Sequence, residues 1–139
     1  MTPGGKRVVL LVDDDSGVRR VVQKVLDLKG YQVKIASDGD QALDLLEAGE
    51  VIDLVLTDIV MPGMSGVQLA LLLHEVAPAL PVLFMSGYPA NFLDDERIRG
   101  RTALLKKPFR ASELLDAVAR ALDGSTAGGE EGERPGVPS

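Results

Sequence analysis

The sequence predicts an α/β domain in which a parallel sheet is covered by helices on both of its faces. Short aliphatic runs alternate with amphipathic helical patterns along the chain, and glycine or proline punctuates the joins. The aliphatic runs are nearly continuous, as in strands buried on both faces. Five strands and five helices are therefore expected in strict alternation, joined by right-handed crossovers.

The first strand and helix show the pattern. Residues 7–12 form an aliphatic run, and a helix is predicted from about Ser16, with Asp15 among the polar groups at its start. Gly30 stands where a glycine would end this helix. One apolar stripe at helical spacing consists of Val18, Val21, Val22, Val25 and Leu26.

The remaining elements are predicted in the same way. Strands are expected at residues 31–36, 53–57, 81–85 and 102–105. Helices are expected at about residues 38–49, where Asp38 is the cap, and at 65–76, 91–99 and 112–122. The domain is predicted to span residues 6–122, after an N-terminal extension at 1–5. Residues 123–139 are rich in Gly, Ser, Glu and Pro, which predicts a disordered tail or linker.

Composition excludes several functional classes. The chain has no cysteine and one histidine, so disulfides, thiolate catalysis and multi-histidine metal sites are excluded. Its net charge of −6 argues against direct nucleic acid binding. No apolar run is long enough to span a membrane, and residues 1–7 lack the apolar stretch of a signal peptide. A cytoplasmic protein is therefore expected.

Polar side chains follow the strands at the points where the strands end. Asp13 and Asp14 follow the first strand, Asp58 the third, Ser86 the fourth and Lys107 the fifth. The carboxyl ends of parallel strands meet at one edge of the sheet, where ligands bind. Three carboxylates gathered there repel one another, and a hard divalent cation such as Mg²⁺ relieves that repulsion. The set predicts phosphoryl transfer to an aspartate.

Four segments then carry a family resemblance. They are residues 10–15 (LLVDDD), 56–66 (LTDIVMPGMSG), 85–88 (MSGY) and 106–109 (KKPF). In this order they resemble the motifs of response-regulator receiver domains of two-component signalling. The resemblance implies a flavodoxin-like fold with strand order 2-1-3-4-5.

The resemblance also implies roles for the acidic residues. Asp58 would accept a phosphoryl group from a histidine kinase or a histidine phosphotransfer protein. Asp13, Asp14, Asp58 and the backbone carbonyl of Val60 would hold Mg²⁺. The chain would then be a signalling receiver that catalyses only its own phosphorylation and dephosphorylation.

Further roles are implied near the last two strands. Ser86 would contact the phosphoryl group, and Lys107 would lie beside it, after a strand and before a cis bond to Pro108. The family often has an aromatic switch residue where this chain has Leu104, which offers neither a ring nor a hydroxyl. A capping Ser or Thr is common where Arg110 stands, so Ser112 is expected to cap the last helix instead.

Alternative functions remain open at this point. Residues 13–17 (DDDSG) also resemble the opening motif of haloacid-dehalogenase-type phosphatases, with Asp13 as nucleophile and Asp15 as general acid. That interpretation leaves Asp58 unexplained. A non-phosphorylated scaffold with a receiver fold is a third possibility. The origin of the chain, as a stand-alone regulator or the receiver of a hybrid histidine kinase, is also open, as is a weak dimer through residues 91–99, 102–105 and 112–122.

Overall fold

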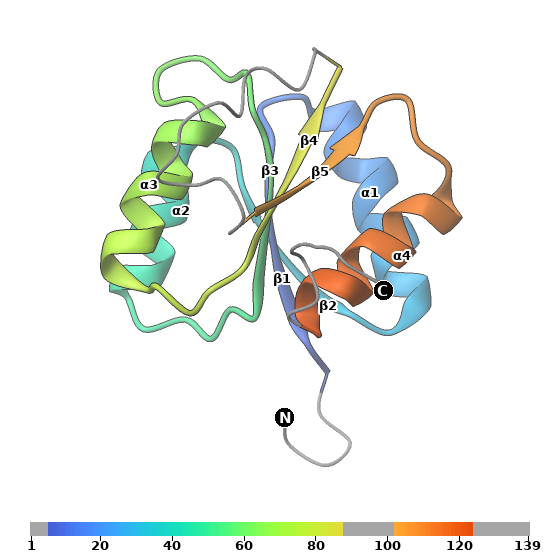
Figure 1. Cartoon of the computed structure of the whole chain (residues 1–139), viewed down its shortest axis with the longest axis horizontal. Helices are drawn as coiled ribbons and strands as arrows, with labels where there is room; N and C mark the ends of the chain where they lie inside the picture. Colours follow the sequence, from blue (N-terminus) through green and yellow to red (C-terminus); the bar gives the residue numbers. More distant parts are fainter. Residues whose placement is uncertain (1–5, 88–101, 124–139) are drawn as a thin grey trace.

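A computed structural model describes residues 6–87 and 102–123, and it contains one five-stranded sheet (Figure 1). Every paired strand is parallel to its neighbour, and the order is β2-β1-β3-β4-β5. This confirms the predicted fold class and strand order. The strands are β1 (Val8–Val12), β2 (Gln32–Ala36), β3 (Leu54–Asp58), β4 (Val82–Ser86) and β5 (Thr102–Lys106).

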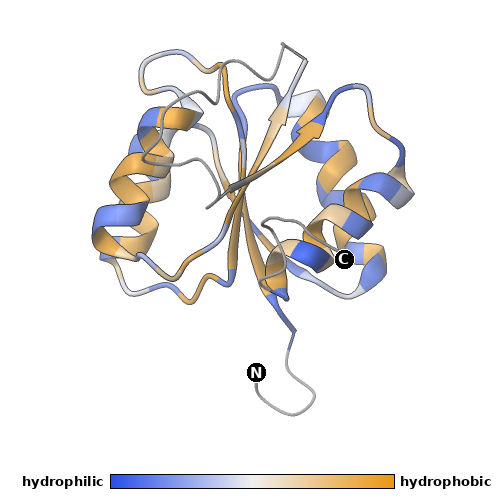
Figure 2. Ribbon diagram, in the orientation of Figure 1, coloured by the Kyte–Doolittle hydropathy of each residue, from blue (hydrophilic) through white to orange (hydrophobic). Residues whose placement is uncertain are grey.

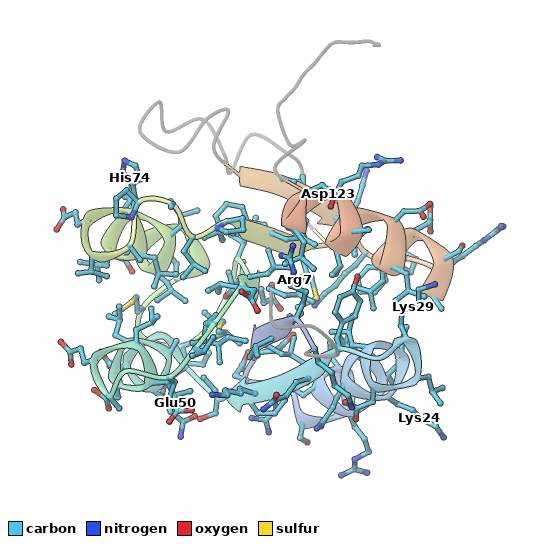
Figure 3. The ribbon with its side chains drawn as sticks, turned by 90° about the horizontal axis from the view of Figure 1, so that it is seen from below. Arg7, Lys24, Lys29, Glu50, His74 and Asp123 are labelled. Atoms are coloured by element: carbon cyan, nitrogen blue, oxygen red, sulfur yellow. The ribbon has the colours of Figure 1, made fainter. Side chains whose placement is uncertain are left out.

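Helices cover both faces of the sheet. They are α1 (Ser16–Lys29), α2 (Gly39–Glu47), α3 (Gly66–Val76) and α4 (Ala111–Leu122). Figure 3 shows α1 and α4 side by side on one face, and α2 and α3 on the other. Among the described residues, every helix is too short or too polar to cross a membrane. The helix predicted at 91–99, the extension at 1–5 and residues 124–139 of the predicted tail lie outside these residues.

The sheet separates two hydrophobic cores, and consecutive strand residues enter opposite ones. In β1, Leu10 and Val12 pack in the core under α2 and α3. Val9 and Leu11 pack in the core under α1 and α4. All five residues of β1 are buried, which is why the sequence runs aliphatic without alternation. Figure 2 accordingly shows largely hydrophobic strands between helices that contain both hydrophobic and hydrophilic residues.

Side-chain caps define the starts of three helices, as expected for α1 and α2. The Asp15 carboxylate accepts hydrogen bonds from the backbone N–H groups of Gly17 and Val18, at 2.8 and 3.2 Å. Asp38 caps α2 and Ser65 caps α3 in the same manner. Gly30 ends α1 with φ of 103°, a left-handed conformation that suits glycine.

The start of the last helix differs from the prediction, because α4 begins at Ala111 and Ser112 does not cap it. The Glu113 carboxylate instead accepts a hydrogen bond from the backbone N–H of Arg110 at 2.7 Å. Strand ends also shift. β3 and β4 each begin and end one residue later than predicted, so Asp58 and Ser86 are their last residues.

The packing of α1 leads to a stability prediction. Leu26 is fully buried whereas Leu28, two residues away, is 80% exposed. Leu26→Ala should lower the free energy of unfolding by about 2–5 kcal/mol, because it leaves a cavity. Leu28→Ala, the matched control, should change it by less than about 0.5 kcal/mol. Urea unfolding followed by far-UV circular dichroism measures both. Equal losses of unfolding free energy in the two variants would contradict the assignment of Leu26 to the core.

Candidate functional site

Side chains from the end of β3 and from the segments that follow β1 and β5 meet at the carboxyl edge of the sheet, which is the upper edge in Figure 1. The Lys107 Nζ lies 3.0 Å from Asp58 Oδ2 and 3.8 Å from Asp13 Oδ2. One ammonium group therefore stands between two carboxylates that are 45 positions apart in the sequence. Asp13, Asp58 and Lys107 therefore lie together at the carboxyl ends of the strands, where the sequence predicted them.

Asp13 is the most constrained member of the site, since it is fully buried. Its Oδ1 accepts a hydrogen bond from the backbone N–H of Asp15 at 2.9 Å, whereas its Oδ2 is buried without a hydrogen bond. Burial raises the pKa of the Asp13 carboxyl, and nearby Asp58 and Asp14 add to the increase. The hydrogen bond from Asp15 and the charge of Lys107 oppose it.

Asp58 is more accessible, with 16% of its side chain exposed. One oxygen is paired with Lys107, and the other accepts a hydrogen bond from the backbone N–H of Val60 at 3.3 Å. The loop after β3 therefore turns back over the acid.

Backbone contacts hold Lys107 beside Ser86. The Lys107 N–H donates to the Ser86 carbonyl at 2.7 Å, and the Lys107–Pro108 peptide bond is cis, as the resemblance implied. Ser86 is buried at the end of β4, one residue beyond Met85, the register partner of Asp58. Ser86 thus lies in the strand next to the acid.

Asp14 and Val60 lie at the surface, unlike the buried Asp13, because both of their side chains are exposed. Within residues 6–87 and 102–123, no three acidic or histidine side chains are close enough together to form a metal site by themselves. The metal set predicted from Asp13, Asp14, Asp58 and Val60 remains a prediction. The chemistry of the donors fits a hard cation, since Asp13 Oδ2 is a buried carboxylate oxygen without a hydrogen-bond donor.

Two residues contact the backbone of Asp58 in a way that the sequence did not predict. The buried Thr57 hydroxyl donates to the Asp58 carbonyl at 2.9 Å, and Gly66 packs against the Asp58–Ile59 peptide. A hydroxyl within a buried aliphatic strand was the available signal for Thr57. Leu104, the residue that replaces a switch aromatic, is half-buried against the core under α2 and α3.

Comparison with known proteins decides the family. The model of the response regulator receiver domain matches residues 9–119. The chain belongs to this family. Receiver-domain relatives include the response regulator FleR of Pseudomonas aeruginosa, which is 42% identical over 88% of this chain and 26% of that protein. The receiver protein CpdR of Brucella abortus is 36% identical, over 82% of this chain and 95% of CpdR.

Solved receivers share the fold. The CheY-like receiver domain protein from Methanospirillum hungatei superposes with a TM-score of 0.79 at 27% identity, over 86% of this chain and 96% of that one. This receiver spans only about a quarter of FleR but nearly all of CpdR. What FleR does beyond its receiver is therefore a property of that longer protein.

The buried acid leads to a pH prediction. Asp13→Asn should raise the free energy of unfolding at pH 7 without divalent cations, because burial disfavours the charged carboxylate in the folded state. A carboxyl whose pKa is higher in the folded state than in the unfolded state destabilises the fold only when it is ionised. The gain should shrink as the pH falls through that raised pKa and vanish below the ordinary value of 3.8.

Urea unfolding at a series of pH values measures this dependence. Asp27→Asn is the control, since Asp27 is an exposed acid near the end of α1 and is not among the groups that shift the pKa of Asp13. The prediction is wrong if Asp13→Asn is less stable than the parent at pH 7, or if its gain does not depend on pH.

Proposed function

We propose that this receiver accepts a phosphoryl group on Asp58 from a histidine kinase or a histidine phosphotransfer protein, in a reaction that depends on Mg²⁺. The observation that carries the proposal is the pairing of Asp58 with Lys107 at 3.0 Å in a partly buried site. A fixed ammonium beside an accessible carboxylate can neutralise the charge that a phosphoryl group brings.

The reaction forms one bond and breaks another. A carboxylate oxygen of Asp58 attacks the phosphorus of a phosphohistidine, and the phosphorus–nitrogen bond breaks in line with it. The product is an aspartyl phosphate, and the released imidazole takes up a proton. Lys107 offsets the negative charge on the transferred oxygens, and the Ser86 hydroxyl donates a hydrogen bond to one of them.

Asp13, Asp14, Asp58 and the Val60 carbonyl are the oxygen donors that would hold Mg²⁺. When bound, the cation neutralises the phosphoryl oxygens and orients them. The burial that raises the pKa of the Asp13 carboxyl supports this assignment, because a bound cation would offset the cost of keeping that buried carboxylate charged.

The phosphatase alternative is not favoured. Asp13, its nucleophile, is fully buried. Asp15, its general acid, caps α1 through hydrogen bonds to two backbone N–H groups. The scaffold alternative has no observation in its favour, since Asp58 keeps an accessible side chain beside Lys107.

The partners follow from charge and family. We assign the chain the role of a cytoplasmic signalling protein that takes a phosphoryl group from a kinase. In this proposal it binds neither nucleic acid nor membrane, and it is not an enzyme toward other molecules. A net charge of −6 supports the exclusion of nucleic acid. The weak dimer through residues 91–99, β5 and α4 is part of the same proposal.

Chemical labelling tests the acceptor. Asp58→Asn should abolish labelling by acetyl phosphate in Mg²⁺, because an amide is not a nucleophile toward phosphorus. Asp116→Asn, which removes an exposed acid on α4, should leave stoichiometric labelling unchanged. Hydroxylamine should release the label, as it does from an acyl phosphate. Undiminished labelling of the Asp58 variant, or turnover of many acetyl phosphates per chain, would contradict the proposal.

Calorimetric titration with MgCl₂ tests the metal residues without any phosphoryl donor. Asp13→Ala and Asp14→Ala should each weaken Mg²⁺ binding by at least about tenfold while the fold is retained. Asp27→Ala, a change of an exposed acid on α1, is the control and should bind as the parent does. If both site variants bind Mg²⁺ as tightly as the parent, the assigned ligands are wrong.

A further inference from the structure

The backbone around Asp58 is packed unusually tightly against helix α3. Gly66, the first residue of that helix, is buried and donates its N–H to the Ile59 carbonyl at 2.7 Å. A Cβ placed on Gly66 would lie 2.1 Å from the Asp58 carbonyl oxygen and 2.9 Å from the Ile59 Cα. The start of α3 therefore rests directly on the peptide that follows Asp58.

Only a residue without a side chain permits this approach. Real Cβ atoms essentially never come within 3.0 Å of another heavy atom outside their own local chain. Gly66 does not have a positive φ, so backbone conformation alone would accept alanine. The requirement for glycine is thus one of contact with backbone atoms, which cannot rotate away as a side chain can.

A second contact holds the same peptide. The Thr57 hydroxyl donates to the Asp58 carbonyl at 2.9 Å, and Thr57 is fully buried. Along β3, Val55 packs in the core under α2 and α3, whereas Leu56 packs in the opposite core. By strand alternation, Thr57 faces the side of Val55, and Asp58 faces the side of Leu56. The hydroxyl thus reaches the carbonyl from the sheet face opposite to the carboxylate.

We propose that Thr57 and Gly66 are positioning residues for the acceptor: they clamp the Asp58–Ile59 peptide and thereby set where the Asp58 carboxylate stands relative to Lys107. The inference rests on the proposed function, because it assigns these residues to phosphorylation of Asp58. Neither residue touches the phosphoryl group.

The size of the effect follows from the geometry of in-line attack. A Cβ on Gly66 would push the Asp58 peptide by about an ångström to restore normal contact. A misplacement of that size at a reacting group reduces rates by about a hundredfold. Stability should fall as well, so the test must separate a slower reaction from a weaker fold.

The helix starts offer a matched control. Gly39 is the buried first residue of α2, as Gly66 is of α3, and it too has no positive φ. A Cβ on Gly39 would meet the Met64 Sδ at 2.6 Å, the end of a flexible side chain, instead of backbone. Gly39→Ala therefore crowds a helix start without touching the Asp58 peptide.

Phosphorylation by acetyl phosphate in Mg²⁺ is measured for the parent, Gly66→Ala and Gly39→Ala at a temperature where urea unfolding shows each to be folded. Gly66→Ala should be phosphorylated at least about tenfold more slowly than the parent, with Gly39→Ala within about twofold of it. The NMR chemical shift of the Lys107 ammonium group should differ from that of the parent in Gly66→Ala but not in Gly39→Ala.

Thr57 provides the variants in case Gly66→Ala does not fold. Thr57→Val keeps the shape but removes the hydroxyl, and should slow phosphorylation by roughly fivefold, whereas Thr57→Ser keeps the hydroxyl and should restore the parent rate. The proposed positioning role is wrong if Thr57→Val, and Gly66→Ala where it folds, are phosphorylated within twofold of the parent rate. Asp58 would still be the acceptor in that case. A parent that takes no label would overturn the proposed function and the clamp together.

Discussion

The site depends on one ammonium group placed between two carboxylates in a partly buried position. Lys107 Nζ is 3.0 Å from Asp58 and 3.8 Å from a buried oxygen of Asp13. At an effective dielectric of about 20, charges about 4 Å apart interact by roughly 4 kcal/mol. Two carboxylates and one ammonium still leave an excess of one negative charge, before the exposed Asp14 is counted. Burial is the main cause of the raised pKa of Asp13, and the charges of Asp58 and Asp14 add to it. The excess of negative charge also favours the further cation that we propose.

The parallel register is what brings these charges together. Val12 is aligned with Thr57, and Asp58 with Met85, so neighbouring strands end within one residue of each other. A slip of one residue would turn each side chain to the opposite face of the sheet. Because β1, β3 and β4 lie between two cores, such a slip would place their aliphatic side chains in the wrong core and would move each polar end residue by one position. The hydrophobic packing therefore fixes the geometry of the charged edge.

This dependence explains what the sequence could predict. The aliphatic runs locate the strands and their carboxyl ends, so Asp13, Asp58 and Lys107 could be assigned to one edge. The end of β3 was placed one residue early because the apolar pattern stops at Thr57, although backbone pairing continues through Asp58. The contact of Gly66 with the Asp58 peptide arises from how closely α3 packs, which no periodicity encodes. Ser112 was chosen as a cap by residue type, but the longer Glu113 side chain reaches back to the backbone N–H of Arg110, the residue before α4.

The same connections determine how a change at Asp58 can spread. Ser86 and Lys107 are joined by a backbone hydrogen bond of 2.7 Å, so a phosphoryl group that attracts both side chains pulls on β4 and on the segment after β5 together. Leu104 is the register partner of Phe84 and packs against the core under α2 and α3. It has no hydroxyl, so no side-chain hydrogen bond can hold it in a second position. We therefore expect any movement of Leu104 to come from repacking of apolar side chains, as a shift between coexisting arrangements.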